Sequence, residues 1–201
     1  YSWSTSAWDC QTGSKLREKE GSVCSGCYAT KGCYVFSSVR SAHNRRMEAL
    51  KDPRFVEAFV VVLNTLYGRM RNTYLSDGVQ IKENRFRWHD AGDIQSVEHL
   101  KMINEIASRT PTVLHWLPTK EAIYVSDFLK QGNKFAENLT VRISHPMIGQ
   151  TFKKRPNDLP FSTVGVENST QQCPAYSQGG KCLDCKNCWV ASIDFINYPV
   201  H

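Results

Sequence analysis

The chain has 201 residues, of which 41% are hydrophobic and 22% are charged. These values are ordinary for a globular domain with its own core, and they exclude an intrinsically disordered chain. The sequence has no run of about 18 apolar residues, and its first residues lack the regions of a signal peptide, so we expect a cytoplasmic protein with no membrane contact. The formal net charge of +6 allows contact with nucleic acid without requiring it.

Two helices are predicted in the first third of the chain, after a cysteine-rich entry. The first is expected at 38–50. The second starts after Asp52-Pro53, a pair that suits a helix N-terminus, and its apolar side chains recur at helical spacing from Val56 to Met70.

The rest of the chain alternates strands with helices. Strands are expected at 1–5, 85–89, 112–117, 139–144, 161–166 and 191–195, and a polar loop at 146–160. Asp93 is predicted to cap a helix that continues to Ile106, and Thr119 to cap a helix that ends near Lys130 and is closed by Gly132. This alternation indicates an α/β fold with a parallel sheet, open or curled into a partial (β/α) barrel. We expect one domain over 1–201, with an N-terminal cysteine-rich segment (1–35) and a C-terminal cysteine-rich subsite (170–190).

Polar residues follow several of the predicted strands. They are His89-Asp90-Ala91-Gly92-Asp93, Pro118-Thr119-Lys120, Ser144-His145 and Glu167-Asn168. Ligands of parallel α/β sheets bind at the carboxyl ends of the strands, so these residues indicate a binding site. Asp93 and Thr119 also have the simpler interpretation of helix caps, whereas His89 and Asp90 directly end an aromatic strand.

Eight cysteines form two groups, one near each end of the chain. Disulfide frameworks normally serve smaller secreted domains, so clustered cysteines here indicate metal ligands. The C-terminal group is Cys173-x8-Cys182-x2-Cys185-x2-Cys188. Its two consecutive x2 spacings are typical of ferredoxin-type iron–sulfur sites, with zinc as the main alternative.

The N-terminal group is Cys10-x13-Cys24-x2-Cys27, with Cys33 further along. Three ligands, Cys10, Cys24 and Cys27, would leave one iron of a [4Fe–4S] cluster open for a substrate or cofactor. Cys33 as a fourth ligand would close the site; we favour three. A single site built from Cys24, Cys27 and part of the C-terminal group also remains open.

Several motifs resemble the gene product 88 family of bacteriophage proteins. They are CQTGSK (10–15), GSVCSGCYATKG (21–32), FRWHDAGDIQS (86–96), HWLPTKE (115–121), NLTVRIS (138–144), CPA (173–175), CLDCKNCW (182–189) and YPVH (198–201). The resemblance covers nearly the whole chain and implies a cysteine-rich phage protein located in the host cytoplasm. Cys33 departs from the family pattern, in which another residue is expected at this position.

The Cys-x2-Cys-Tyr-Ala signature at 24–29 and the Val-Gly-Val-Glu-Asn run at 164–168 resemble, more distantly, phage proteins related to radical S-adenosylmethionine enzymes. This resemblance implies a three-cysteine [4Fe–4S] cluster at the mouth of a partial (β/α) barrel, and S-adenosylmethionine as a candidate cofactor. The usual spacing of those cysteines is Cys-x3-Cys-x2-Cys, so the x13 gap is a departure.

Three functions remain open. The first is an iron–sulfur enzyme or redox protein acting on a small molecule, with His89, Asp90 and Lys120 as candidate catalytic residues. Its cofactor pocket would be formed by Tyr28, His89, Asp90, Asp93, Thr119, Lys120, Arg142 and Ser144, with Lys120 and Arg142 available for a carboxylate or phosphate. The second is a zinc-stabilised module that binds nucleic acid or a host protein. The third is a virion or host-interaction protein in which metal only stabilises the fold.

Overall fold

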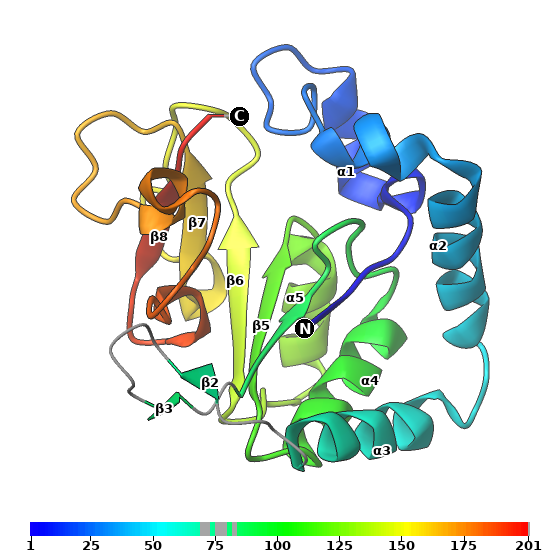
Figure 1. Cartoon of the computed structure of the whole chain (residues 1–201). Coiled ribbons are helices and arrows are strands. Elements are labelled where there is room, and N and C mark those ends of the chain that lie inside the picture. Colours follow the sequence, from blue (N-terminus) through cyan, green and yellow to red (C-terminus); the bar gives the residue numbers. More distant parts are fainter. Residues whose placement is uncertain (69–72, 75–79, 82–83, 201) are drawn as a thin grey trace.

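The structure is a computed structural model that describes residues 1–68, 73–74, 80–81 and 84–200 (Figure 1). Its main sheet has six strands: β1 (Ser2–Trp3), β4 (Arg85–Trp88), β5 (Leu114–Thr119), β6 (Leu139–Ser144), β7 (Phe161–Val164) and β8 (Phe195–Tyr198). They lie in the order β1-β4-β5-β6-β7-β8, and every neighbouring pair is parallel. Within the described residues, β1 and β8 form the two edges. The sheet is therefore open, as in a partial (β/α) barrel, and the predicted α/β class is confirmed.

The helices are α1 (Gln11–Arg17), α2 (Ser37–Ala49), α3 (Phe55–Gly68), α4 (Val97–Ser108) and α5 (Ala122–Lys130). Two short strands, β2 (Thr73–Tyr74) and β3 (Gln80–Ile81), form a separate antiparallel pair. Within the described residues, no helix is long and apolar enough to cross a membrane.

One face of the main sheet is covered by α3, α4 and α5. Side chains from these helices share one hydrophobic core with Trp88, Leu117 and Ile143 of the sheet. The apolar stripe predicted from Ile94 to Ile106 supplies four of the fully buried side chains: Ile94, Leu100, Ile103 and Ile106. Helix spacing in the sequence thus identified the layer that covers this face.

The opposite face is covered by the C-terminal cysteine-rich segment, drawn in orange in Figure 1. The Trp189 ring lies 5.1 Å from the Trp116 ring, and its Nε1 donates to the carbonyl of Phe86 at 2.9 Å. Thr140 of β6 donates to the carbonyl of Trp189 at 3.0 Å. Because both faces are covered, the central strands are buried almost throughout.

Most of the predicted elements are confirmed within one to three residues. The strand at 139–144 has the predicted bounds, α2 lies one residue from its prediction, and Gly132 ends α5 with a φ of 80°. Met70, the predicted end of α3, lies outside the described residues. The predicted strand at 112–117 instead runs from Leu114 to Thr119, and its pairing with β6 continues through Pro118 and Thr119.

Three local predictions are wrong. The helix after Asp93 begins only at Val97, and its cap is Ser96, whose Oγ accepts from the backbone N–H of His99 at 3.1 Å. Thr119 does not cap α5, since Glu121 occupies that position. The last strand is β8 rather than 191–195, because residues 190–193 form a turn in which Ile193 donates to the carbonyl of Val190.

Candidate functional site

The N-terminal cysteine-rich segment lies over the carboxyl ends of the strands. In Figure 1 it is the blue region around α1, at the end toward which the strand arrows point. Hydrogen bonds attach it to three consecutive strand ends, those of β4, β5 and β6. The polar residues that follow these strands therefore face the cysteines.

Glu121 makes the attachment at the end of β5. Its carboxylate is buried and accepts from both the backbone N–H and the Oγ1 of Thr12, each at 2.7 Å. Thr12 lies in the first turn of α1, where backbone N–H groups have no partner within the helix and favour an anion. The carboxylate therefore holds the start of α1, and with it the adjacent Cys10.

The other two attachments involve residues 21–28. Val23 donates to the carbonyl of Pro146 at 2.9 Å, and Ile148 donates to the carbonyl of Gly21 at 2.9 Å, beyond the end of β6. The Tyr28 hydroxyl donates to the backbone carbonyl of Asp90, beyond the end of β4. The loop that carries Cys24 and Cys27 is thus fixed on both sides.

Cys10, Cys24 and Cys27 lie close together as free thiols. Burial raises the pKa of Cys10 above its ordinary value, and Asp93 and the other two thiols add to the effect. Burial also raises the pKa of Cys24, which the neighbouring Lys120 cation opposes. The thiols of Cys10 and Cys24 therefore keep their protons until a metal replaces them.

Gly13 makes room between two of these thiols. A Cβ at position 13 would lie 2.9 Å from the Cβ of Cys10, 3.6 Å from its Sγ and 3.7 Å from the Sγ of Cys24. Any side chain at this position would fill the space that the two sulfur atoms face. Cys33, in contrast, is exposed.

Asp93, Thr119 and Lys120 meet as the sequence predicted, although neither Asp93 nor Thr119 is a helix cap. One carboxylate oxygen of Asp93 accepts from the Thr119 hydroxyl at 2.5 Å, and the other accepts from the Lys120 backbone N–H at 2.8 Å. Burial raises the pKa of Asp93 to about 6. This carboxylate joins the loops after β4 and β5 beside the cysteines.

His89 lies deeper, in the aromatic core. Its backbone has a φ of 54°, and its ring lies 5.8 Å from the ring of Trp3 and 5.4 Å from that of His99. Burial lowers the pKa of His89 well below its ordinary value. Both ring nitrogens lack a hydrogen-bond partner among the described residues. The adjacent Asp90 carboxylate accepts from the hydroxyl of Tyr34 at 3.4 Å.

Arg142 and Ser144 of β6 make their side-chain hydrogen bonds with the C-terminal part of the chain. Arg142 is fully buried and donates to four backbone carbonyls, those of Phe161, Asn187, Val190 and Ile193. Ser144 accepts from the hydroxyl of Ser162 at 3.2 Å. Arg142 thus holds the C-terminal segment against the sheet, and its guanidinium is occupied by carbonyl oxygens rather than open to a ligand.

The four C-terminal cysteines also gather in one place. Cys188 is buried against Trp116 and Ile196, and its Sγ lies 3.1 Å from the hydroxyl oxygen of Tyr198. Burial raises the pKa of Cys188 to about 11, and the charges of Cys173 and Cys182 add to it. Burial raises the pKa of Cys173 in the same way, with contributions from Cys182 and Cys185.

Arg85 attaches this second group to β4. Its guanidinium donates to the carbonyls of Cys185 at 2.6 Å and Leu183 at 3.0 Å, and it lies over the Trp189 ring at 5.3 Å. As the side chains stand, no three His, Cys, Asp or Glu residues in the described part of the chain are arranged to hold a single metal ion.

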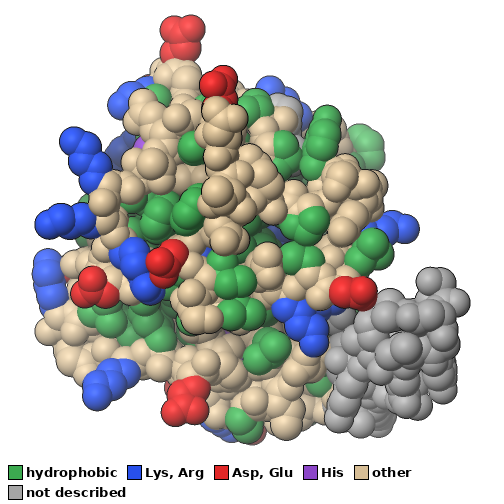
Figure 2. Space-filling view, turned by 90° about the vertical axis from the view of Figure 1, so that its left-hand side faces the viewer, with side chains coloured by type: hydrophobic (Ala, Val, Ile, Leu, Met, Phe, Trp, Pro, Cys, Tyr) green, Lys and Arg blue, Asp and Glu red, His purple; other side chains and the backbone are tan. Residues whose placement is uncertain are grey.

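Basic side chains do not gather into one patch on the face that carries β7 and β8. Figure 2 shows them spread around its periphery, with hydrophobic side chains between them.

Comparisons with curated proteins and with solved structures found no match to this chain. One protein-family model, described as Gene product 88, matches residues 4–191. This range includes all the cysteines and every strand except β1 and β8. The chain therefore belongs to the gene product 88 family.

Proposed function

We propose that this protein is an iron–sulfur protein with two [4Fe–4S] clusters, one held by Cys10, Cys24 and Cys27 and the other by the four C-terminal cysteines. The observation that carries the proposal is the gathering of free thiols from separate segments into two groups. Thiolates are the usual ligands of such clusters, and consecutive Cys-x2-Cys spacings are typical of them.

The residues around the N-terminal group suit such a cluster. Each thiolate of a cubane binds its own iron, so the sulfur atoms need more space between them than a single ion requires. Gly13 leaves space of this kind beside Cys10 and Cys24. Lys120 supplies a cation near Cys24 that favours the thiolate form.

Three cysteine ligands leave one iron free to bind a small molecule. A cluster supplies electron transfer and, at an open iron, a Lewis acid for that molecule. Asp93 and Thr119 fix the backbone around Lys120, whose ammonium group could hold a carboxylate or phosphate at the strand ends. S-adenosylmethionine is one candidate ligand of this kind.

The proposal predicts the metal content and colour of the whole protein. Purified without oxygen, the chain should be brown and contain iron and acid-labile sulfide in equal amounts, about four of each per cluster. If S-adenosylmethionine is the ligand of the open iron, its addition should change the electron paramagnetic resonance signal of the reduced N-terminal cluster. A colourless protein that contains zinc and no sulfide would refute the iron–sulfur proposal and leave a zinc-stabilised binding module.

A further inference from the structure

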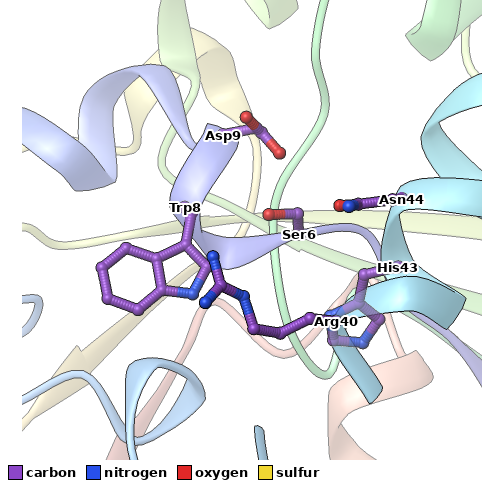
Figure 3. A pocket seen from close by; sticks show the side chains of 6 residues that line it. All are labelled: Ser6, Trp8, Asp9, Arg40, His43 and Asn44. Carbon is purple, nitrogen blue, oxygen red and sulfur yellow. The ribbon is translucent and has the colours of Figure 1, made fainter. Parts of the chain in front are cut away.

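A second polar pocket lies outside the cysteine groups, between the turn at Ala7–Asp9 and α2 (Figure 3). Its volume is about 140 Å³, and it is lined by Ser6, Trp8, Asp9, Arg40, His43 and Asn44. At about 30 Å³ per water molecule, it has room for a ligand of about five non-hydrogen atoms.

Two of the residues that line this pocket, Ser6 and His43, are buried. Ser6 and His43 are only 5% and 7% exposed, yet in the described part of the chain the Ser6 hydroxyl and the His43 ring make no hydrogen bond. The His43 ring lies 6.2 Å from the Tyr34 ring. The polar atoms of these two side chains do not belong to the buried atoms that lack a partner, so they reach the cavity and are available to a ligand.

The rim of the pocket carries one acidic and one basic side chain on separate elements. Asp9 comes from the turn before Cys10, and Arg40 comes from α2. The two are not ion-paired with each other, and neither has another ionic partner among the described residues. A ligand between them would meet a positive charge on one side and a negative charge on the other.

Trp8 concentrates positive charge on its side of the pocket. The guanidinium groups of Arg40 and Arg17 lie 5.7 and 4.9 Å from its ring, and Figure 3 shows Arg40 beside the indole. The Arg17 guanidinium also donates to the carbonyl of Ala7, whereas the Arg40 guanidinium makes no hydrogen bond among the described residues and is free to bind an anion. This side therefore suits a carboxylate, and Asn44 adds an amide donor and acceptor.

We propose that this pocket binds a small zwitterion, namely the carboxylate and ammonium groups of an α-amino acid. The carboxylate is bound by Arg40, the ammonium group by Asp9, and the remaining hydrogen bonds are completed by Ser6, His43 and Asn44. Glycine has the five non-hydrogen atoms for which the cavity has room. None of the residues that line the pocket is a proposed cluster ligand, although Asp9 directly precedes Cys10.

The test is ligand-observed nuclear magnetic resonance with the full chain and three probes: glycine, acetate and methylammonium. Glycine should bind, and acetate and methylammonium should each bind at least about tenfold more weakly, since each lacks one charge-assisted contact. Arg40→Gln should weaken the binding of glycine and of acetate at least about tenfold each, since both lose the contact with the guanidinium. Asp9→Asn should weaken the binding of glycine about tenfold but leave the binding of acetate unchanged.

Arg45→Gln is the matched control, because Arg45 is an exposed residue of the same helix whose guanidinium, among the described residues, donates only to Ser41, at 2.8 Å. It should leave glycine binding unchanged. The proposal is overturned if glycine does not bind, if acetate binds as well as glycine, or if Arg45→Gln weakens binding as much as Arg40→Gln. Equal thermal unfolding of the variants would show that the losses do not come from misfolding.

Discussion

Single residues decide whether the N-terminal cysteines can meet. Glu121 holds the start of α1 through two hydrogen bonds to Thr12, and Gly13 keeps the neighbourhood of Cys10 open. Neither residue is chemically unusual in the sequence. Their importance comes from what lies next to them in space.

Gly13→Ala should lower the iron content of the N-terminal site. The added Cβ would lie 2.9 Å from the Cβ of Cys10, closer than side-chain carbons approach, so Cys10 must shift. Gly26→Ala is the matched control, because a Cβ at Gly26 meets no atom within 4 Å. Iron analysis of both variants checks the prediction, and an equal loss in the two variants would contradict it.

At the level of elements, the C-terminal segment takes the place that a helix would have on the second face of the sheet. It contains only short turns of helix, so its backbone carbonyls depend on partners elsewhere. Arg142 and Arg85 supply many of those donors from β6 and β4. The position of the second cysteine group therefore depends on two arginines of the sheet.

Arg142→Met should detach this segment and destabilise the protein. Hydrogen bonds to a charged group contribute about 1.5–3 kcal/mol each. The free energy of unfolding should therefore fall by several times the amount that a surface ion pair contributes. Arg155→Met is the control, because among the described residues the guanidinium of Arg155 forms an ion pair with Asp194 alone, at 2.9 Å on the surface, and such pairs contribute about 0–1 kcal/mol. Urea unfolding and the rate at which a thiol reagent modifies Cys188 measure the effect. Similar values for both variants would disprove this role of Arg142.

At the scale of the whole molecule, folding buries a neutral histidine in the core. Trp88 Nε1 donates to Nδ1 of His115 at 3.2 Å, so the ring proton lies on Nε2, 2.9 Å from the Thr110 hydroxyl oxygen. Burial lowers the pKa of His115 from 6.5 to about 3. Between these values the unfolded chain binds a proton that the folded protein does not.

The free energy of unfolding should therefore fall as the pH falls from 6.5 toward 3, and this contribution should be fully present above pH 6.5. His115→Gln removes the titrating group, so its stability should depend less steeply on pH over this range, even if the variant is less stable at neutral pH. Urea unfolding at a series of pH values measures the slope. Parallel curves for the two proteins would show that His115 makes no contribution.

The fold could be predicted largely from the sequence, because helix spacing and buried strands reflect local chemistry. The strand at 139–144 and the helical stripe from Ile94 to Ile106 are examples. The predictions for Asp93 and Thr119 failed because a side-chain oxygen can cap a helix or bond across the chain, and the sequence does not distinguish these. Here the two residues bond to each other across two loops.

The candidate site could be predicted in part. Asp93, Thr119 and Lys120 follow strands that end at the same edge of the sheet, so their meeting was foreseen. Arg142 was expected to hold an anionic ligand, whereas the structure gives its donors to carbonyl groups. Glu121 was missed, although it directly follows Thr119 and Lys120 at a strand end. Its partner, Thr12, is distant in the sequence, and no local pattern identifies such a pair.

The most direct test of the two-cluster account is the iron content of cysteine variants purified without oxygen. Cys10→Ser, Cys24→Ser and Cys27→Ser should each lose about half of the iron, since four of about eight irons belong to each cluster. Cys188→Ser should lose the other half, and Cys33→Ser should lose none, because Cys33 is exposed and assigned to neither group. Loss of all the iron from any one variant would indicate a single site built from both ends of the chain, and iron-free wild-type protein would contradict the account altogether.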